Sequence, residues 1–292
     1  MKTAIRTLVA VLLLLECTIA QQTDRSPESP LDHPVFTTID FPGAFATRAI
    51  RINNSGRVVG SFDLQNGQVT HAFFYSDGSM KKIDPPRSEG YAEALGINSS
   101  DVVVGTNYHF EQNGFIYING KYQVVSFAPT INYAAQINDQ QVIVGVYAKV
   151  CCDLHGYRYE PAAHQLTPID YPDAVRTMPL GINNAGVIVG TWLDSTDIYH
   201  GFIQQDGTLS PVDVPGAIET TVFTINNAGT IGGYFDDAGS VRHGFLLRNG
   251  TFTTVDVPGS AETIILGIND LGVIAGAYFD SSGISHGFIG HL

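Results

Sequence analysis

Histidine recurs along this chain at nearly regular intervals, and its imidazole can ligate a metal ion or transfer a proton. Asn113 occupies the matching position in one further copy of the surrounding motif. An amide can replace a hydrogen bond more easily than it can replace a metal ligand. We therefore expect these histidines to be structural. They are His71, His155, His200, His243 and His286.

Aspartate recurs in two series, one before an x-Pro corner and one after a strand that ends in an aromatic residue. Paired carboxylates can bind Ca²⁺ or act as acid and base, whereas an aspartate in a turn hydrogen-bonds to the backbone two residues on. Repetition in nearly every copy favours turn capping. The first series is Asp40, Asp84, Asp170, Asp213 and Asp256, and the second is Asp63, Asp194, Asp236 and Asp280. No cofactor is expected, with calcium near Asp236 and Asp237 as the alternative.

One stretch, Gly283 to Gly287, matches the G-x-S-x-G pattern of a nucleophilic serine. That motif requires a turn from a strand into a helix, and this stretch is a loop that enters a strand. We expect Ser285 to have no catalytic role.

These residues belong to a repeat of about 43 residues that must position them. Each copy has an Ile-Asn pair, a short turn, an apolar strand, a His-Gly-Phe-like motif and an Asp-x-Pro corner. Six copies predict six four-stranded antiparallel blades, and hence an all-β, six-bladed β-propeller. The asparagines are Asn53, Asn98, Asn138, Asn183, Asn226 and Asn269, and a glycine follows each by seven residues, at Gly60, Gly105, Gly145, Gly190, Gly233 and Gly276.

The two ends of the repeat region complete each other. The last copy stops after its third strand, and residues 36–44 before the first copy match the fourth strand of the fifth copy, residues 252–260. The N-terminal strand is therefore predicted to pair with the last blade and to close the wheel. In a closed wheel, the recurring histidines start the third strand of each blade, about 10 Å outside the first strand, and lie too far apart to share one ion.

His71-Ala72-Phe73 and the His-Gly-Phe motifs at His200, His243 and His286 resemble the extracellular HAF repeat family. The resemblance spans about residue 36 to the C-terminus. It implies a repeat protein that is exported and has no established activity.

The chain begins with Lys2 and Arg6, an apolar run and a small residue at Ala20, the order of a secretory signal peptide. The sequence predicts residues 1–20 as signal peptide, 21–34 as a disordered spacer and 35–292 as the propeller. We expect export to an extracellular, cell-surface or periplasmic location, with no membrane span in the mature chain.

The formal net charge of −13 argues against nucleic acid and anionic membranes as partners. The adjacent Cys151 and Cys152 leave a strained disulfide and two thiols both open.

A binding site is expected where the copies differ, on the face that carries the longer loops. The residue five before each asparagine is Arg48, Glu93 or Tyr133 in the first three copies and Met178, Thr221 or Ile264 in the last three, so three dissimilar polar groups cluster in the first three blades. Nearby loops add tyrosine, histidine and arginine. Such residues suit a sugar or another small polar ligand. The predicted ligand-binding residues are Arg48, Tyr91, Glu93, Tyr108, His109, Tyr133 and Arg176.

Two functions are consistent with these residues. The first is a non-catalytic recognition module for a glycan, peptide or protein partner. The alternative is a propeller-type glycan hydrolase or lyase that uses Glu93 with Arg48 and with Tyr133 or Arg176, and it requires a second group near Glu93. Whether the chain is an enzyme stays open at this point, and no catalytic or metal-ligating residue is assigned.

Overall fold

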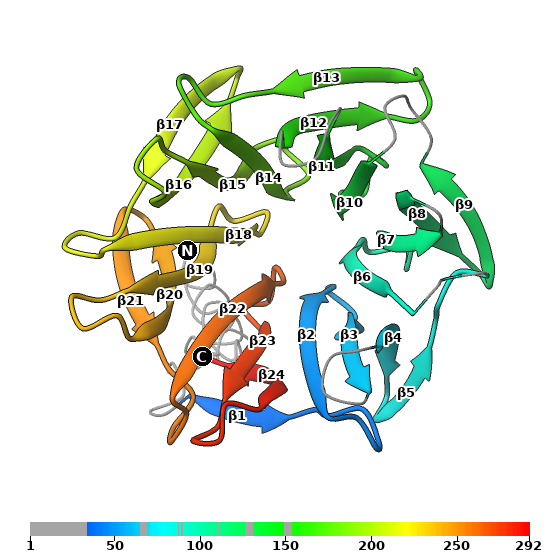
Figure 1. Cartoon of the computed structure of the whole chain (residues 1–292), viewed down its shortest axis with the longest axis horizontal. Helices are drawn as coiled ribbons and strands as arrows, with labels where there is room; N and C mark the ends of the chain where they lie inside the picture. The colour runs from blue at the N-terminus through cyan, green and yellow to red at the C-terminus, as the bar shows by residue number, and fades with distance from the viewer. Residues whose placement is uncertain are drawn as a thin grey trace, which may run out of the picture. The chain divides into compact units, whose positions relative to one another are not determined.

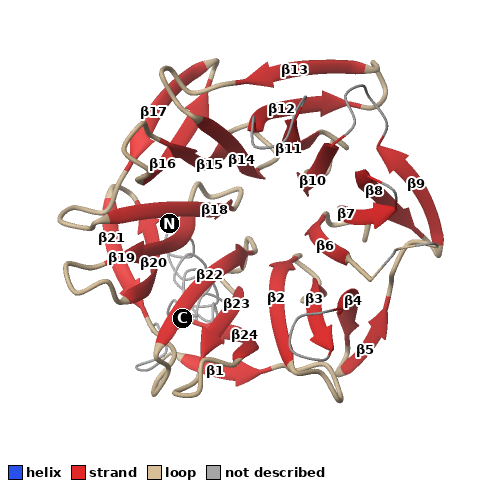
Figure 2. Ribbon diagram, in the orientation of Figure 1, coloured by secondary structure: helices blue, strands red, loops and turns tan. Residues whose placement is uncertain are grey.

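The computed structural model describes residues 34–64, 69–86, 88, 90–109, 111–125, 131–148 and 154–292. The predicted signal peptide, the spacer up to residue 33, and both cysteines of the Cys151-Cys152 pair lie outside these residues. The described residues contain 24 strands and no helix. Six four-stranded sheets surround a central axis, which confirms the predicted six-bladed β-propeller (Figures 1 and 2). Among the described residues there is accordingly no helix that could cross a membrane.

Every blade has the same antiparallel order from the axis to the rim. The innermost strands are β2 (Ala46–Ile52), β6 (Ala92–Ile97), β10 (Ile131–Ile137), β14 (Arg176–Ile182), β18 (Glu219–Ile225) and β22 (Glu262–Ile268). The second strands are β3 (Val58–Leu64), β7 (Val103–His109), β11 (Ile143–Ala148), β15 (Ile188–Leu193), β19 (Ile231–Asp236) and β23 (Ile274–Phe279). The third strands are β4 (Val69–Ser76), β8 (Glu111–Ile118), β12 (Leu154–Glu160), β16 (Tyr199–Gln205), β20 (Arg242–Arg248) and β24 (Ser285–His291). The outermost strands are β5 (Ser79–Lys82), β9 (Lys121–Val125), β13 (Gln165–Ile169), β17 (Thr208–Val212), β21 (Thr251–Val255) and, in the sixth blade, β1 (Val35–Thr38).

The N-terminal strand closes the wheel as predicted. Strand β1 pairs antiparallel with β24, and Thr38 lies opposite Phe288. The corner that follows β1 adds the backbone hydrogen bond from Ile39 to Gly287, with an N···O distance of 2.8 Å. The sixth blade therefore has four strands, and β1 covers the edge that β24 would otherwise expose.

The glycine seven residues after each asparagine is required by close packing within the blade. A Cβ at Gly60 would lie 2.0 Å from the carbonyl oxygen of Arg48 and against the ring of Phe73. The other five glycines would meet the equivalent carbonyl at 2.0 to 2.1 Å. No side chain can be accommodated at such a distance, so the blade excludes every residue except glycine.

The core is divided among the six junctions between blades. In five of them, the third strand of one blade contributes an apolar side chain to the cluster formed with the next blade. Burial of these side chains stabilises each junction by roughly 25 cal/mol per Å² of apolar surface. Trp192 of β15 packs against the cluster of the remaining junction, between blades 3 and 4, and it stacks between Tyr171 and His200. These contacts support the packing role that its place in the repeat indicates.

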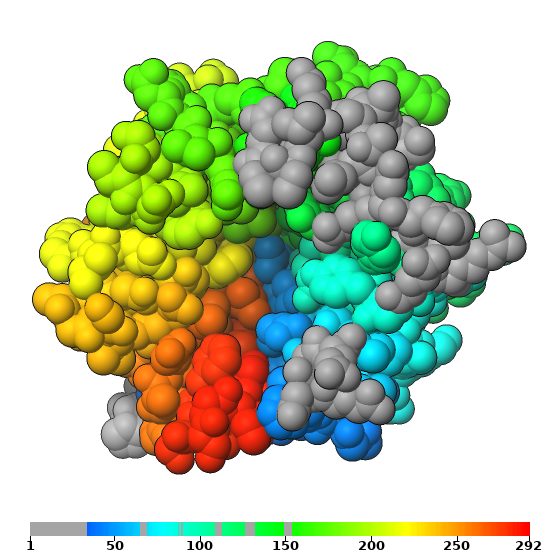
Figure 3. Space-filling view, viewed as in Figure 1, coloured from blue at the N-terminus to red at the C-terminus, as the bar shows by residue number. Residues whose placement is uncertain are grey.

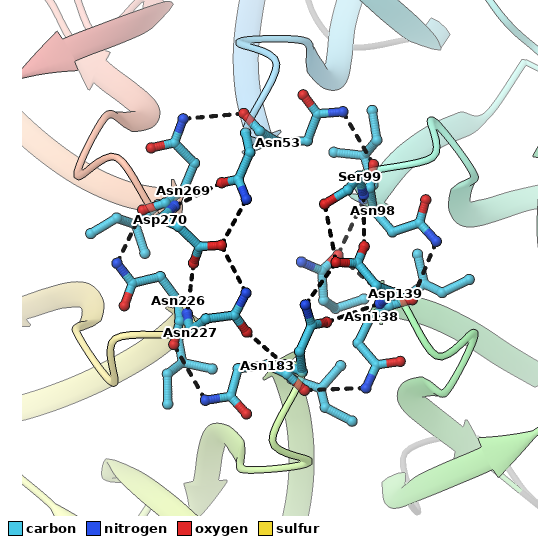
Figure 4. A pocket seen from close by; sticks show the side chains of 18 of the residues that line it. Asn53, Asn98, Ser99, Asn138, Asp139, Asn183, Asn226, Asn227, Asn269 and Asp270 are labelled. Carbon is cyan, nitrogen blue, oxygen red and sulfur yellow. Dashed lines mark hydrogen bonds between the residues drawn. The ribbon is translucent and has the colours of Figure 1, made fainter.

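The six repeated asparagines form a closed ring of hydrogen bonds around the axis (Figure 4). Each Nδ2 donates to the backbone carbonyl of the asparagine in the next blade, from Asn53 to Asn98 at 3.1 Å and so on until Asn269 donates back to Asn53 at 3.1 Å. Each Oδ1 also accepts from backbone NH groups of its own turn, as Asn138 does from Gln140 and Val142. One side chain thus shapes the turn and joins two blades.

A single arginine fills the axis next to this ring. Arg51 of β2 is 4% exposed and donates to backbone carbonyls of Ile50, Leu180, Phe223 and Leu266, which belong to four different blades. In every blade the pairing of the first two strands shifts register at this level, which is a β-bulge. Burial lowers the pKa of Arg51 to about 9, so the guanidinium is charged at neutral pH.

The antiparallel order places the connections on two opposite faces. The turns between the first and second strands and between the third and fourth strands lie on one face, which we call the turn face. The connections between the second and third strands and between successive blades lie on the other, which we call the loop face. Figure 3 looks onto the loop face and shows it hollowed at the centre, with the blue of the first blade visible inside the hollow.

Candidate functional site

Three of the predicted binding residues come together in one cluster at the loop face. The cluster consists of Arg48 and Ser61, which lie opposite each other on β2 and β3 of blade 1, Asp63 of β3, and Tyr91 and Glu93 of blade 2. We call these five residues the mouth cluster. The Arg48 guanidinium donates to both oxygens of Asp63 at 3.2 Å, and its Nε donates to the Ser61 hydroxyl at 3.1 Å. This fork geometry fixes the guanidinium at the mouth.

Glu93 joins the two blades in this cluster. Its Oε1 lies 3.6 Å from Arg48 and accepts a hydrogen bond from Ser61 at 3.1 Å. Its Oε2 accepts a hydrogen bond from the Tyr91 hydroxyl at 2.6 Å. One guanidinium therefore faces two carboxylates, those of Asp63 and Glu93, and the second group that an enzyme requires near Glu93 is present.

The cluster is ordered by its own contacts and is still accessible. The side chains of Arg48, Glu93 and Asp63 are 33%, 17% and 11% exposed, respectively. Burial, the charge of Glu93 and the hydrogen bond to it raise the pKa of Tyr91, so this hydroxyl is a donor at neutral pH. A ligand at this position would meet donors and acceptors that are already oriented, which reduces the entropy lost on binding.

The other four predicted binding residues are not members of the mouth cluster. Tyr133 lies near enough for its charge to affect the pKa of Tyr91. Tyr108 is exposed, and its backbone NH donates to the carbonyl of Tyr91 at 3.0 Å. Arg176 starts β14 in blade 4, and its buried Nε has no partner among the described residues. The side chain of His109 lies outside those that the structure describes.

A second cluster, which the sequence did not predict, lies where blade 5 meets blade 6. Arg242 donates to both oxygens of Asp236 at 2.9 and 3.1 Å and lies 3.8 Å from both Glu219 and Glu262. Its guanidinium also lies 4.0 Å from the centre of the Tyr234 ring. Burial alone would lower the pKa of Arg242, but the hydrogen bond to Asp236 and the charges of Tyr234, Asp236 and Glu262 together raise it. The sequence feature that could have revealed this cluster is the arginine immediately before His243, because blade 1 has a threonine at the same position.

The repeated histidines contact aspartates at the corners of their own blades. His286 lies between Asp40, at 2.8 Å from Nδ1, and Asp280, at 3.7 Å from Nε2. His200 and His243 lie between two aspartates in the same way, and His71 and His155 each contact the aspartate of their own x-Pro corner. No group of three or more possible metal ligands exists in the part of the chain that the structure describes.

The aspartates considered for calcium have other partners. Asp236 binds Arg242, and Asp237 accepts backbone hydrogen bonds from Gly239 and Val241 in its own turn. The Ser285 hydroxyl is buried and lies 3.2 Å from the backbone carbonyl of Thr47. Turn capping and blade packing account for these side chains.

A small polar dish lies on the axis at the turn face (Figure 4). Its space is about 60 Å³, well below the roughly 300 Å³ at which ligand pockets begin. Asp139 and Asp270 in its wall each accept hydrogen bonds from neighbouring turns, including those from Ser99 and Asn227. The dish therefore suits ordered water better than an organic ligand.

The histidine contacts predict how stability depends on pH. Hydrogen bonds to Asp256 and Asp40 raise the pKa of His243 and His286, so their stabilising contribution is complete below the unfolded value of 6.5 and is lost as pH rises through the folded value. Backbone hydrogen bonds lower the pKa of Asp237 and Asp280, so their contribution is lost as pH falls below the unfolded 3.8. We expect the melting temperature to be highest between about pH 4 and pH 6.5 and to decrease toward pH 8.5.

The variant His286→Asn tests this assignment, because blade 2 has Asn113 at the matching place. Its melting temperature should change less between pH 5.5 and pH 8.5 than that of the unmodified protein. An unchanged slope would show that overall charge repulsion, and not the histidine contacts, sets the pH dependence.

The fold and the mouth define the class of protein: a six-bladed β-propeller with a pre-ordered polar cluster at the loop face. Several solved structures share this fold at low sequence identity. TolB from Acinetobacter baumannii matches with a TM-score of 0.58 and 10% identity over 85% of this chain and 65% of that one, so the chain spans about two thirds of TolB. A lectin from Aleuria aurantia, solved in complex with Fucα1-6GlcNAc, gives 0.54 and 9% over 84% of this chain and 91% of that one. The SapL1 lectin, solved in complex with α-methyl fucoside, gives 0.55 and 8% over 82% and 90%.

At such identities the likeness establishes the fold alone. No protein-family model matches the sequence, and no curated protein does. Membership of the HAF repeat family therefore stays a prediction from the repeat motif.

Proposed function

We propose that this protein is an exported, non-catalytic recognition module whose mouth cluster binds a glycan. The observation that supports the proposal is the Arg48–Asp63–Glu93–Tyr91 arrangement, which presents a fixed set of donors and acceptors at the hollow of the loop face. Charged pairs of this kind suit hydroxyl groups, which donate and accept at the same time. Two of the structures that share the fold are lectins solved with fucose-containing sugars.

The hydrogen bonding in the cluster favours recognition over hydrolysis. Both oxygens of Glu93 and both oxygens of Asp63 already accept hydrogen bonds within the cluster. A catalytic acid or base must exchange its proton with the substrate, and a retaining or inverting pair must be free on both sides of the scissile bond. The mouth carboxylates are instead tied to one guanidinium.

A printed array of fucosylated, galactosylated and N-acetylglucosamine-containing glycans tests the proposal, followed by calorimetric titration of the strongest binder. The Glu93→Gln variant should reduce affinity at least tenfold, about 1.4 kcal/mol, because it removes a charged acceptor at the site. Asp77→Asn makes the same change at an exposed turn on the turn face and should leave affinity unchanged.

Two outcomes would contradict the proposal. Equal affinity in the Glu93→Gln variant and the unmodified protein would place binding elsewhere. Shortened glycans detected by mass spectrometry after incubation, and lost in the Glu93→Gln variant, would show that the mouth cluster hydrolyses or eliminates its ligand.

A further inference from the structure

The junction between blades 3 and 4 departs from the other five in one residue of the third strand. Three residues after the repeated histidine, or after Asn113 in blade 2, that strand has an apolar side chain in every blade except the third. The apolar residues are Phe74, Ile116, Ile203, Leu246 and Ile289. Blade 3 has Arg158 at the same register, opposite Val144 of β11.

The five apolar side chains all fill the space between their blade and the next. Phe74 packs against the core of blade 2, Ile116 against that of blade 3, and the other three against blades 5, 6 and 1. The cluster at the junction of blades 3 and 4 has no member from this position. Arg158 therefore occupies the position from which the other five blades contribute an apolar side chain to the junction with the next blade.

A second departure lies across the same junction. Gln204 of β16 lies opposite Ile188, and the matching position is tyrosine in the first three blades, leucine in the fifth and glycine in the sixth. The Gln204 amide makes no hydrogen bond to the described residues and is half-buried. Two polar residues thus replace apolar ones on opposite walls of one junction.

A groove of about 570 Å³ occupies this junction at the turn face. That volume falls within the roughly 300–1,000 Å³ of ligand pockets in proteins. The apolar floor includes Ile169, Val187 and Ile188, and the walls carry Arg158, Gln204, Gln205 and Asp206. The groove therefore lies at the junction that lacks the usual apolar side chain of the third strand.

The chemistry of the walls indicates a neutral ligand rich in hydroxyl groups. Arg158 is already paired with Glu160, so the groove offers no unpaired cation for an anionic ligand. The two glutamine amides and the guanidinium provide donors and acceptors, and the Asp206 carboxylate adds acceptors and disfavours an anion. The apolar floor can cover the CH face of a sugar ring. We propose that this groove is a second binding site, separate from the mouth, for a neutral saccharide of one or two rings.

The repeat itself supplies the variant that closes this site. Arg158→Ile with Gln204→Leu introduces the residues that other blades have at these positions, so the blade should still pack, and the filled junction should melt no lower than that of the unmodified protein. Gln204→Leu alone is a milder second variant. The Glu93→Gln protein serves as the matched control, because it changes the mouth and leaves the groove intact.

Saturation-transfer difference NMR with the methyl glycosides of glucose, galactose, fucose and N-acetylglucosamine, each at millimolar concentration, tests the proposal. The expected result is a signal for at least one glycoside that persists in the Glu93→Gln variant and falls at least tenfold when Arg158→Ile and Gln204→Leu are added to that variant. A signal that these two substitutions leave unchanged in the Glu93→Gln background would overturn the proposal, as would the absence of any signal with the Glu93→Gln variant. The glycan array reports on the mouth separately, so failure of one site does not decide the other.

Discussion

Arg51→Met should lower the free energy of unfolding by at least about 3 kcal/mol. The methionine has a similar length but no donors, so the carbonyls of Leu180, Phe223 and Leu266 would lose their shared partner on the axis. Each buried acceptor left without a donor costs roughly 1–3 kcal/mol. Chemical denaturation followed by tyrosine and tryptophan fluorescence measures this loss.

Two further variants separate the causes. Arg51→Lys keeps the charge but has no planar fork to reach carbonyls of several blades, so its stability should fall between that of Arg51→Met and the unmodified protein. Arg248→Met removes an exposed arginine and should change stability by no more than about 0.5 kcal/mol. An Arg51→Met protein that is more stable than the unmodified one would mean that the cost of burying the charge exceeds the value of its hydrogen bonds.

Asn138→Ala should also destabilise the protein by about 3 kcal/mol. The substitution removes the hydrogen bond to the carbonyl of Asn183 in the next blade and leaves the NH groups of Gln140 and Val142 without their acceptor. All of these contacts are buried or half-buried, so water cannot fully replace them. The measurement is again the free energy of unfolding, with Gln140→Ala as an exposed control in the same turn.

Asn138→Asp distinguishes the two halves of the side chain. Its carboxylate can still accept from the turn but places an oxygen against the carbonyl of Asn183. A protonated carboxyl group can donate there, so the loss should be smaller at pH 4 than at pH 8. An equal loss at both pH values would contradict the role that the ring geometry gives to the donor.

Comparison of the copies predicted most of the fold. The six asparagines and six glycines established the blade and its number of copies, because residues that recur at one period must occupy equivalent places. The match between residues 36–44 and residues 252–260 predicted the closure that strand β1 makes with β24. The structural role of the histidines followed from the distance between blades and from Asn113.

The candidate sites were predicted only in part. Arg48, Tyr91 and Glu93 were found because they differ among copies at or near one position of the first strand. The role of Arg51 was not predicted, because its partners are backbone carbonyls of four blades. These carbonyls become neighbours only when the blades surround one axis.

The second cluster and the groove were missed for a related reason. Arg242 begins β20, directly after a connection whose length varies among the copies, so its alignment with the other copies is hard to establish without coordinates. Arg158 differs from its counterparts in the other blades, but only the packing of the other five junctions shows that an apolar side chain is absent there.

The asparagine ring also bears on how such a molecule can change over generations. Each blade donates the same asparagine hydrogen bond to the next blade, in the same direction around the axis. A duplicated blade would therefore carry both the donor and the acceptor that this contact requires. Adding or removing a blade would require no new kind of contact in the asparagine ring, only a ring of different diameter. The limit lies on the axis, because Arg51 donates to carbonyls of four of the six blades, and a wider circle would move those carbonyls out of its reach.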